Sequence, residues 1–181
     1  MKIKDKIFDY VRSKQPERSA RFPHLDQPLK IMLIYESDYL ERNDAIKTIR
    51  QELLKRQMDI TMWGYVEKKE ITTLILPQSR ILGPNDYNLL GKPREEVLTD
   101  LQSEHYDLLI DLTTRPLLPL RYLALFTDAD FKVGLNLGEG IHDMLISLPD
   151  FNPEQGEEAA IEASWLFNQI MGYLTTIKSN D

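Results

Sequence analysis

Cysteine is absent from the sequence, and only three of the 181 residues are histidine. Without cysteine the chain has no disulfides, no thiolate nucleophile and no cysteine-ligated metal site. The histidines, His24, His105 and His142, are far apart in the sequence, which is unlike the close ligand spacing of a zinc site. We therefore predict that the protein uses neither a metal nor a cofactor.

Long apolar runs are absent as well. No stretch approaches the roughly 18 consecutive apolar residues that are typical of a transmembrane helix. Charged residues at Lys4, Asp5, Lys6 and Asp9 interrupt the first apolar residues, which excludes the pattern of a secretory signal. The composition, 42% hydrophobic and 28% charged, is that of an ordinary globular protein, and we expect a cytoplasmic location.

Positive charge is scarce outside the N-terminus. The formal net charge is −7, yet residues 1–30 carry eight Lys or Arg against four Asp or Glu, whereas residues 104–181 carry four against thirteen. Docking to nucleic acid or to a membrane surface would have to use this basic N-terminal segment. A solvated basic helix is the simpler interpretation, so we do not expect a nucleic-acid partner.

The chain divides into an arm and a main domain. Apolar residues recur every fourth position over residues 2–14, which predicts an amphipathic helix. Residues 15–28 contain three prolines and predict an extended connector. We therefore predict an N-terminal arm, residues 1–28, followed by one domain, residues 29–181.

Strand and helix patterns alternate through the main domain. Strands are predicted at 29–35, 58–65, 72–77, 106–112, 131–135 and 144–148, and helices at 38–57, 93–104, 120–126 and from a cap at Asn152 onward. The stretch between residues 79 and 93 is predicted to be a long loop. Strands alternating with helices indicate a three-layer, Rossmann-like α/β fold with a mostly parallel sheet of about six strands.

Three glycines, Gly134, Gly138 and Gly140, lie between the last two predicted strands. Their spacing differs from GxGxxG, and GxxxxGK[ST] occurs nowhere, so neither a dinucleotide loop nor a Walker loop is indicated. We interpret Gly138 and Gly140 as positive-φ positions of a tight reversal, and Gly134 as relief of crowding within a strand. So short a reversal predicts that the last strand runs antiparallel to its neighbour.

The loop before the predicted helix at 93–104 carries the first set of candidate ligand residues. Asp86 could act as a general base or metal ligand, Asn88 could hold a substrate hydroxyl, and Lys92 could pair with a phosphate. The alternative is that Asp86 and Asn88 form side-chain turns and that Gly91-Lys92-Pro93 merely starts the helix.

Ligands of open parallel sheets collect at the carboxyl ends of the strands. This rule selects Thr113, Thr114 and Arg115, which offer hydroxyls and a guanidinium for an anionic small molecule, and Asn136 after the fifth strand. It also predicts that Lys92, Thr114 and Arg115 gather at one rim. The alternative is a helix cap with a surface arginine.

Two acidic patterns in the sequence could suggest acid–base pairs. Asp107 and Asp111 lie about 13 Å apart along an extended strand and cannot share a proton. His142 beside Asp143 suggests an acid–base pair, but no serine nucleophile accompanies it and neighbouring strand residues face opposite ways. A structural role for His142 is therefore the favoured interpretation.

The order of DYNLLGKP, YDLLIDL, PLRYLALFTDA and FKVGLNLGEGIHDMLISL resembles a family of short uncharacterised bacterial α/β proteins, a domain of unknown function. The resemblance covers most of residues 1–148 and implies an α/β fold without an assigned activity. The FKVG strand is also faintly similar to the N-terminal lobe of two-lobed glycosyltransferases, which implies a sugar-nucleotide ancestry.

Two functional hypotheses follow. The first is a non-enzymatic binding or regulatory module, which acts through an anionic small molecule, a protein partner or a second copy of the chain. The alternative is an enzyme that binds a nucleotide, sugar nucleotide or phosphoester at the carboxyl ends of the parallel strands.

Overall fold

Strands and helices alternate in the computed structural model, which describes residues 3–37, 40–67, 76–138, 140–149 and 161–177, with only the backbone given at 40–43. The elements are α1 (Ile3–Ser13), β1 (Lys30–Glu36), α2 (Leu40–Lys55), β2 (Asp59–Tyr65), β3 (Ser79–Leu82), the 3-10 turn η1 (Pro84–Asp86), α3 (Glu95–Gln102), β4 (Tyr106–Asp111), α4 (Leu118–Phe126), β5 (Ala129–Leu135), β6 (Met144–Ile146) and α5 (Ala163–Thr176).

The six strands form one parallel sheet in the order β3-β2-β1-β4-β5-β6. The chain builds the sheet outward from β1 to β3 and then returns to place β4 on the other side of β1. The carboxyl ends of β1 and β4 therefore flank the point at which the strand order reverses. The predicted Rossmann-like α/β fold is confirmed.

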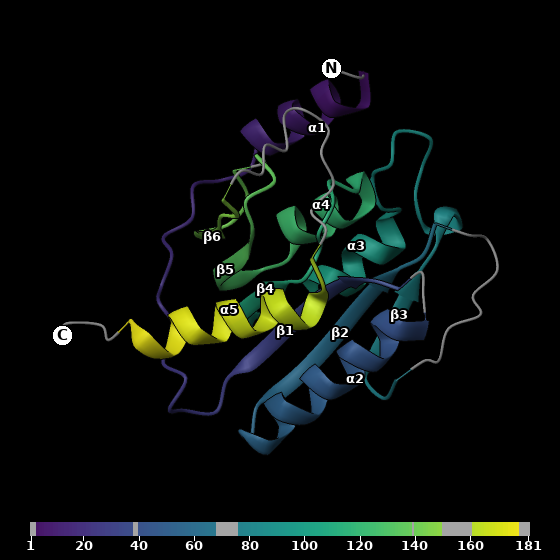
Figure 1. The fold of residues 1–181 in the computed structure, drawn as a ribbon. Helices are drawn as coiled ribbons and strands as arrows, with labels where there is room; N and C mark the ends of the chain where they lie inside the picture. Colours follow the sequence, from purple (N-terminus) through teal and green to yellow (C-terminus); the bar gives the residue numbers. More distant parts are fainter. Residues whose placement is uncertain (1–2, 38–39, 68–75, 139, 150–160, 178–181) are drawn as a thin grey trace.

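Each face of the sheet is covered by its own apolar core. Ile31 and Leu33 of β1 face a core completed by α2 and α5, whereas Met32 and Ile34 face a core completed by α1, α3 and α4. Figure 1 shows α2 and α5 across the near face of the sheet, with α3 and α4 behind it. Because both faces are covered, the apolar runs of β1 and β4 are buried throughout, as expected for central parallel strands.

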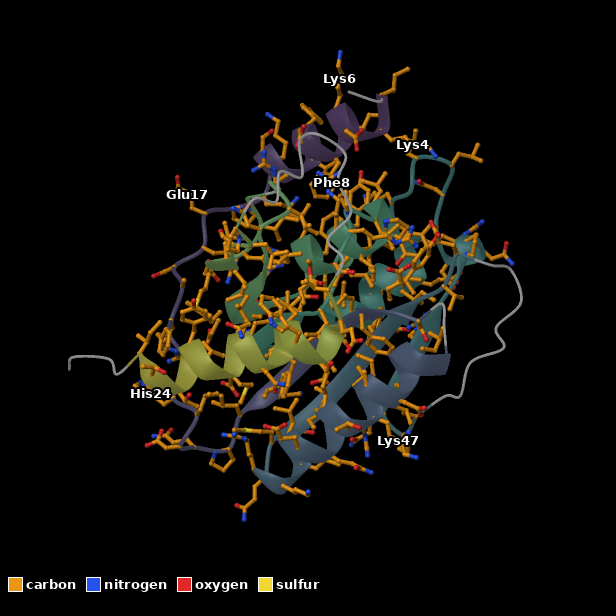
Figure 2. The ribbon with its side chains drawn as sticks, viewed as in Figure 1. Lys4, Lys6, Phe8, Glu17, His24 and Lys47 are labelled. Atoms are coloured by element: carbon orange, nitrogen blue, oxygen red, sulfur yellow. The ribbon has the colours of Figure 1, made fainter. Side chains whose placement is uncertain are left out.

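Helix α1 packs on the outside of α4 and extends the second core. Phe8 is fully buried, its ring centroid lies 4.9 Å from that of Tyr122, and the Arg121 guanidinium lies 4.1 Å from the centroid of the Phe8 ring. Asp5 accepts a hydrogen bond from Arg121 at 3.2 Å. In Figure 2, Phe8 points from α1 toward the body of the protein, whereas Lys6 points away from it. The amphipathic pattern of the N-terminal segment thus produces a docked helix.

The third strand lies later than predicted. Ser79–Leu82, which the sequence placed in a long loop, forms β3 and pairs in parallel with β2. Of the predicted strand 72–77, residues 72–75 lie outside the described residues, and Leu76 and Pro77 are not in a strand. The prediction was wrong because SRIL has only partly buried side chains at its first three positions, as befits a short edge strand without a strong apolar signal.

The last strand runs parallel to β5, which corrects the predicted antiparallel reversal. Val133 pairs with Met144 and Leu135 with Ile146. The connection therefore returns along only the last three residues of β5, and not along a full-length strand. This short return replaces the usual helical crossover because β6 is itself only three residues long.

The C-terminal helix begins at Ala163, after Glu162 in an extended conformation at the N-cap. The predicted cap at Asn152 lies outside the described residues, and the extended Glu162 excludes a single helix running from there. The apolar stripe is confirmed from Leu166 through Ile170 to Leu174, which are all buried. None of the helices in the described part of the chain has the length and apolar character needed to cross a membrane.

Candidate functional site

Buried polar side chains concentrate at the carboxyl ends of β1 and β4. Six polar or charged residues are buried among those described: Glu36, Ser37, Asp111, Thr113, Thr127 and Lys132. Glu36 and Asp111 are the last residues of their strands, and Ser37 and Thr113 follow them closely. Four of the six thus lie at the reversal point of the strand order, where ligands of this fold class bind.

A carboxylate–guanidinium network occupies the end of β1. Arg115 donates from Nε to both carboxylate oxygens of Glu36, at 3.0 and 3.1 Å, and from Nη2 to Glu36 and, at 2.8 Å, to Glu67. The Glu36 side chain is 4% exposed, so the guanidinium is the cation that compensates a buried carboxylate. The hydrogen bonds that Arg115 donates to Glu36 raise the pKa of the guanidinium. Two carboxylates therefore neutralise this positive charge.

A buried histidine–aspartate pair occupies the end of β4. His142 Nε2 lies 3.0 Å from Asp111 Oδ2, and the two side chains are 3% and 6% exposed. The other carboxylate oxygen of Asp111 accepts the backbone N–H of Thr113 at 2.9 Å. The pair connects β4 to the loop that precedes β6, across the end of β5.

Gly134 provides the space that the imidazole ring occupies. A Cβ atom added at Gly134 would lie 2.8 Å from His142 Nε2, closer than any ordinary contact. The loop itself turns through Gly138 at φ 77° and Gly140 at φ 61°, which confirms the positive-φ interpretation of these two glycines. The three glycines thus seat His142 beside Asp111.

Two hydroxyl groups near this edge are buried without a partner among the described residues. Thr113 Oγ1 and the Tyr87 hydroxyl form no hydrogen bond. Tyr87 packs edge-on against Tyr65, the last residue of β2, with ring centroids 5.5 Å apart. An unpaired buried hydroxyl is unfavourable for folding, so each of these groups requires an explanation.

A family model for a family of unknown function, DUF6913, matches residues 2–161. The chain belongs to this family. The resemblance to an uncharacterised α/β family that the sequence indicated is thereby confirmed. No curated protein matches the chain.

One solved structure with similarity to the chain is the E. coli heptosyltransferase WaaC with ADP. The two share 12% sequence identity at a TM-score of 0.47, and the match covers 78% of this chain and 47% of the other. The chain thus spans about half the length of that protein.

The predicted loop residues are used in local structure. Asp86 accepts the N–H of Gly83 at 2.8 Å, and Asn88 Oδ1 accepts the N–H groups of Leu90 and Lys92 at 2.9 and 3.1 Å. These are the side-chain turns that the sequence left open as the alternative. Whether Asp86 or Asn88 also contacts a ligand remains a prediction.

The structure gives Lys92 and Arg115 different surroundings. Lys92 Nζ lies 5.7 Å from the ring centroid of Phe126, the last residue of α4, whereas Arg115 precedes the first turn of that helix and contacts Glu36. Thr113 and Arg115 belong to the cluster at the ends of β1 and β4, and Thr114 between them is half-buried.

Asn136 organises the loop after β5. Its side chain accepts the N–H of Gly138 at 3.2 Å and donates to Ser147 at 3.4 Å.

Sequence reasoning did not select Glu36, Asp111 or His142 as site residues. Asp143, the neighbour considered for His142, instead bonds the Arg18 guanidinium and the backbone N–H of Lys132. A usable signal exists in the sequence, since both central apolar strands end in a carboxylate. Among the described residues no group of three or more His, Asp or Glu side chains is placed to hold a metal ion.

Lys132 is a further buried ionisable residue on the same face of the sheet. Its ammonium donates to the carbonyls of Ala124 and Leu125 at 2.7 and 3.1 Å, at the C-terminal end of α4. Burial lowers its pKa to about 7. The end of a helix favours a cation, so Lys132 has a structural role in closing α4.

A hollow lies at the opposite, amino edge of the sheet. It has a volume of about 490 Å³ and is lined by Phe22, Leu25, Leu174 and neighbouring side chains. His24 and Asp26, which contribute polar groups there, are exposed. The buried polar groups all lie elsewhere, so this hollow is a weaker candidate.

Proposed function

We propose that the protein is a binding module that holds a small polar molecule at the site formed by Glu36, Asp111, Thr113, Arg115 and His142, hereafter the strand-end site. The observation that supports this proposal is the concentration of buried polar side chains at the ends of β1 and β4. Burying polar groups is costly unless they are paired, and one of these groups, the Thr113 hydroxyl, has no hydrogen-bond partner among the described residues. A ligand that bonds this hydroxyl would offset that cost.

The strand-end site also has the features of a preformed site. Glu36 and Asp111 belong to central strands, and Arg115 and His142 are held by them through hydrogen bonds. Side chains fixed in this way need little reordering when a ligand binds. The location at the reversal of strand order agrees with where ligands of this fold class bind.

A second candidate is an enzyme that uses the same site. The observation that favours it is the Asp111–His142 pair, since a carboxylate that orients an imidazole is the arrangement of a general base. In that case, purified protein would convert a bound ligand, and His142→Gln would abolish conversion while binding persists. Binding without conversion supports the module.

The test is a ligand screen read by backbone amide NMR shifts. The probes are adenosine, AMP, UDP-glucose, glucose and glucose 6-phosphate, each added to the full chain at millimolar concentration. Saturable shifts at Glu36, Thr113 and Gly134 support the proposal, because these amides lie in or beside the strand-end site. Shifts confined to the amino-edge hollow around Leu25 and Leu174, or the absence of any saturable shift, contradict it.

A further inference from the structure

The structure leaves one ring nitrogen of the buried histidine for a ligand. We infer that Nδ1 of His142 accepts a hydrogen bond from a ligand hydroxyl, and that the strand-end site takes a neutral, hydroxyl-bearing molecule in preference to its phosphorylated form. This inference rests on the proposed function and names the chemical class that the site recognises. The hydrogen bonds around the imidazole and the charges near it support the inference.

The contacts of Asp111 select one tautomer of a neutral His142 ring. Asp111 uses its Oδ1 to accept from the Thr113 N–H and its Oδ2 to contact His142 Nε2 at 3.0 Å. An ionised carboxylate can only accept, so Nε2 must carry the proton. In the neutral ring Nδ1 is then an acceptor, and within the described part of the chain it has no hydrogen-bond partner.

The backbone fixes where this acceptor can lie. The ring is confined between Asp111 and Gly134, whose missing side chain leaves room for it. Residues two positions apart in a strand share a face of the sheet. Asp111 therefore shares the face of Leu109, which carries α4, and Gly134 shares that of Lys132, which bonds the end of α4. His142 therefore stands over the carboxyl edge of β4 and β5, on the same face as Glu36.

The charge of the strand-end site disfavours phosphate. Among the described residues, Glu36 and Asp111 supply two carboxylates and Arg115 supplies a guanidinium, while Glu67 beside the site accepts a hydrogen bond from the same guanidinium. A phosphate would have to compete with two carboxylates for that cation in a partly desolvated position. Hydroxyl groups, in contrast, can donate to the carboxylates and to the imidazole.

Two charged side chains next to the imidazole, Asp143 and Lys132, already have partners among the described residues. Asp143, the next residue, is bonded by the Arg18 guanidinium at 3.0 and 3.2 Å and by the N–H of Lys132. The Lys132 ammonium is directed to the carbonyls at the end of α4. Neither cation is therefore placed to receive a phosphate beside the imidazole.

The first experiment needs no ligand. Long-range ¹H–¹⁵N NMR of the full chain at pH 7.5 distinguishes the two neutral tautomers and the imidazolium for each of the three histidines, with His142→Gln used for assignment. We expect His142 as the Nε2–H tautomer. The Nδ1–H tautomer, or an imidazolium at this pH, would overturn the inference, because Nδ1 would then donate.

The second experiment compares matched pairs, adenosine with AMP and glucose with glucose 6-phosphate. We expect the neutral member of at least one pair to bind at least as tightly as its phosphorylated partner, and His142→Gln to weaken that binding about tenfold, as for loss of a buried hydrogen bond. His105→Gln is the control, since His105 also contacts an aspartate but is half exposed. It should change binding less than twofold.

The outcomes distinguish failure of the inference from failure of the proposed function. Tighter binding of the phosphorylated members at the strand-end site overturns the inference and leaves the proposed function standing. Unchanged binding in His142→Gln does the same, because a ligand then binds without this acceptor. If no probe binds, the proposed function fails, whereas the tautomer measurement still decides the state of His142.

Discussion

The unpaired Thr113 hydroxyl allows a direct test of whether the strand-end site is kept for binding. Thr113 is 3% exposed and its Oγ1 has no partner among the described residues. Leaving a buried hydroxyl unpaired costs about 1–3 kcal/mol of folding free energy. Thr113→Val removes the hydroxyl and keeps the shape, so it should raise the free energy of unfolding by up to about that amount. For a chain of this size, each kcal/mol corresponds to roughly 2–4 °C in the melting temperature.

Thr127 provides the matched control. It is buried to a similar degree, 2% exposed, but its Oγ1 donates to the Leu123 carbonyl at 2.7 Å. Thr127→Val loses a formed hydrogen bond, and we expect it to lower the free energy of unfolding by about 0.5–1.5 kcal/mol. The same chemical change should thus have opposite signs at the two threonines.

Urea unfolding followed by tryptophan fluorescence measures both variants, and equal m-values confirm that the comparison is between similar states. The ligand found by NMR should bind Thr113→Val more weakly than the parent, although this variant is the more stable protein. A Thr113→Val variant destabilised as much as Thr127→Val would refute the reasoning, since the hydroxyl would then have a partner, such as a buried water, in the free protein.

Three further changes test the packing and charges of the molecule. Gly134→Ala should destabilise the protein by about 1–3 kcal/mol because the added Cβ would overlap the imidazole of His142. The control Gly172→Ala, in open space within α5, should be neutral or stabilise the protein by up to about 1 kcal/mol, and equal effects of the two changes in urea unfolding would contradict this. Arg115→Met should cost about 3–5 kcal/mol by removing the guanidinium that bonds the buried carboxylate of Glu36, and adding Glu36→Gln should recover most of the loss. A double variant no more stable than the single one would argue against the pairing. Lys132 has its pKa lowered from 10.5 to about 7, so between these pH values the unfolded chain holds a proton that the folded chain has released. The free energy of unfolding should therefore rise with pH across that window, by at most about 1.4 kcal/mol per pH unit, and Lys132→Met should lack this rise when unfolding is measured at pH 7 and pH 9.

The sheet was predictable because its central strands carry unambiguous patterns. The runs at 31–35 and 108–110 are apolar at every position, which is expected of strands buried on both faces. The short edge strands, Ser79–Leu82 and Met144–Ile146, carry no such signal, so one was missed and the direction of the other was wrong. Direction depended on where the pairing of β6 begins relative to the end of β5, and this register is not encoded in loop length alone.

The sequence indicated the edge at which the candidate site lies but not which residues form it. The rule for parallel sheets selected the edge at which the candidate site lies and, with it, Thr113 and Arg115. It could not show that Arg115 turns toward Glu36 or that His142 reaches back to Asp111, 31 positions earlier in the chain. Side-chain pairs between distant segments are set by the packed fold, and neighbours in sequence, such as His142 and Asp143, can have separate partners.

The contacts of the N-terminal arm bear on the site as well as on the core. Arg18 of the connector bonds Asp143, the residue next to His142, and a Cβ added at Gly140 would lie 2.9 Å from Nη1 of Arg12 in α1. The arm therefore contacts the loop that carries the imidazole at two points, while Phe8 anchors α1 in the core beneath. A division of the chain at residue 28 would separate these groups, so we propose that the arm supports the strand-end site and does not form an independent unit.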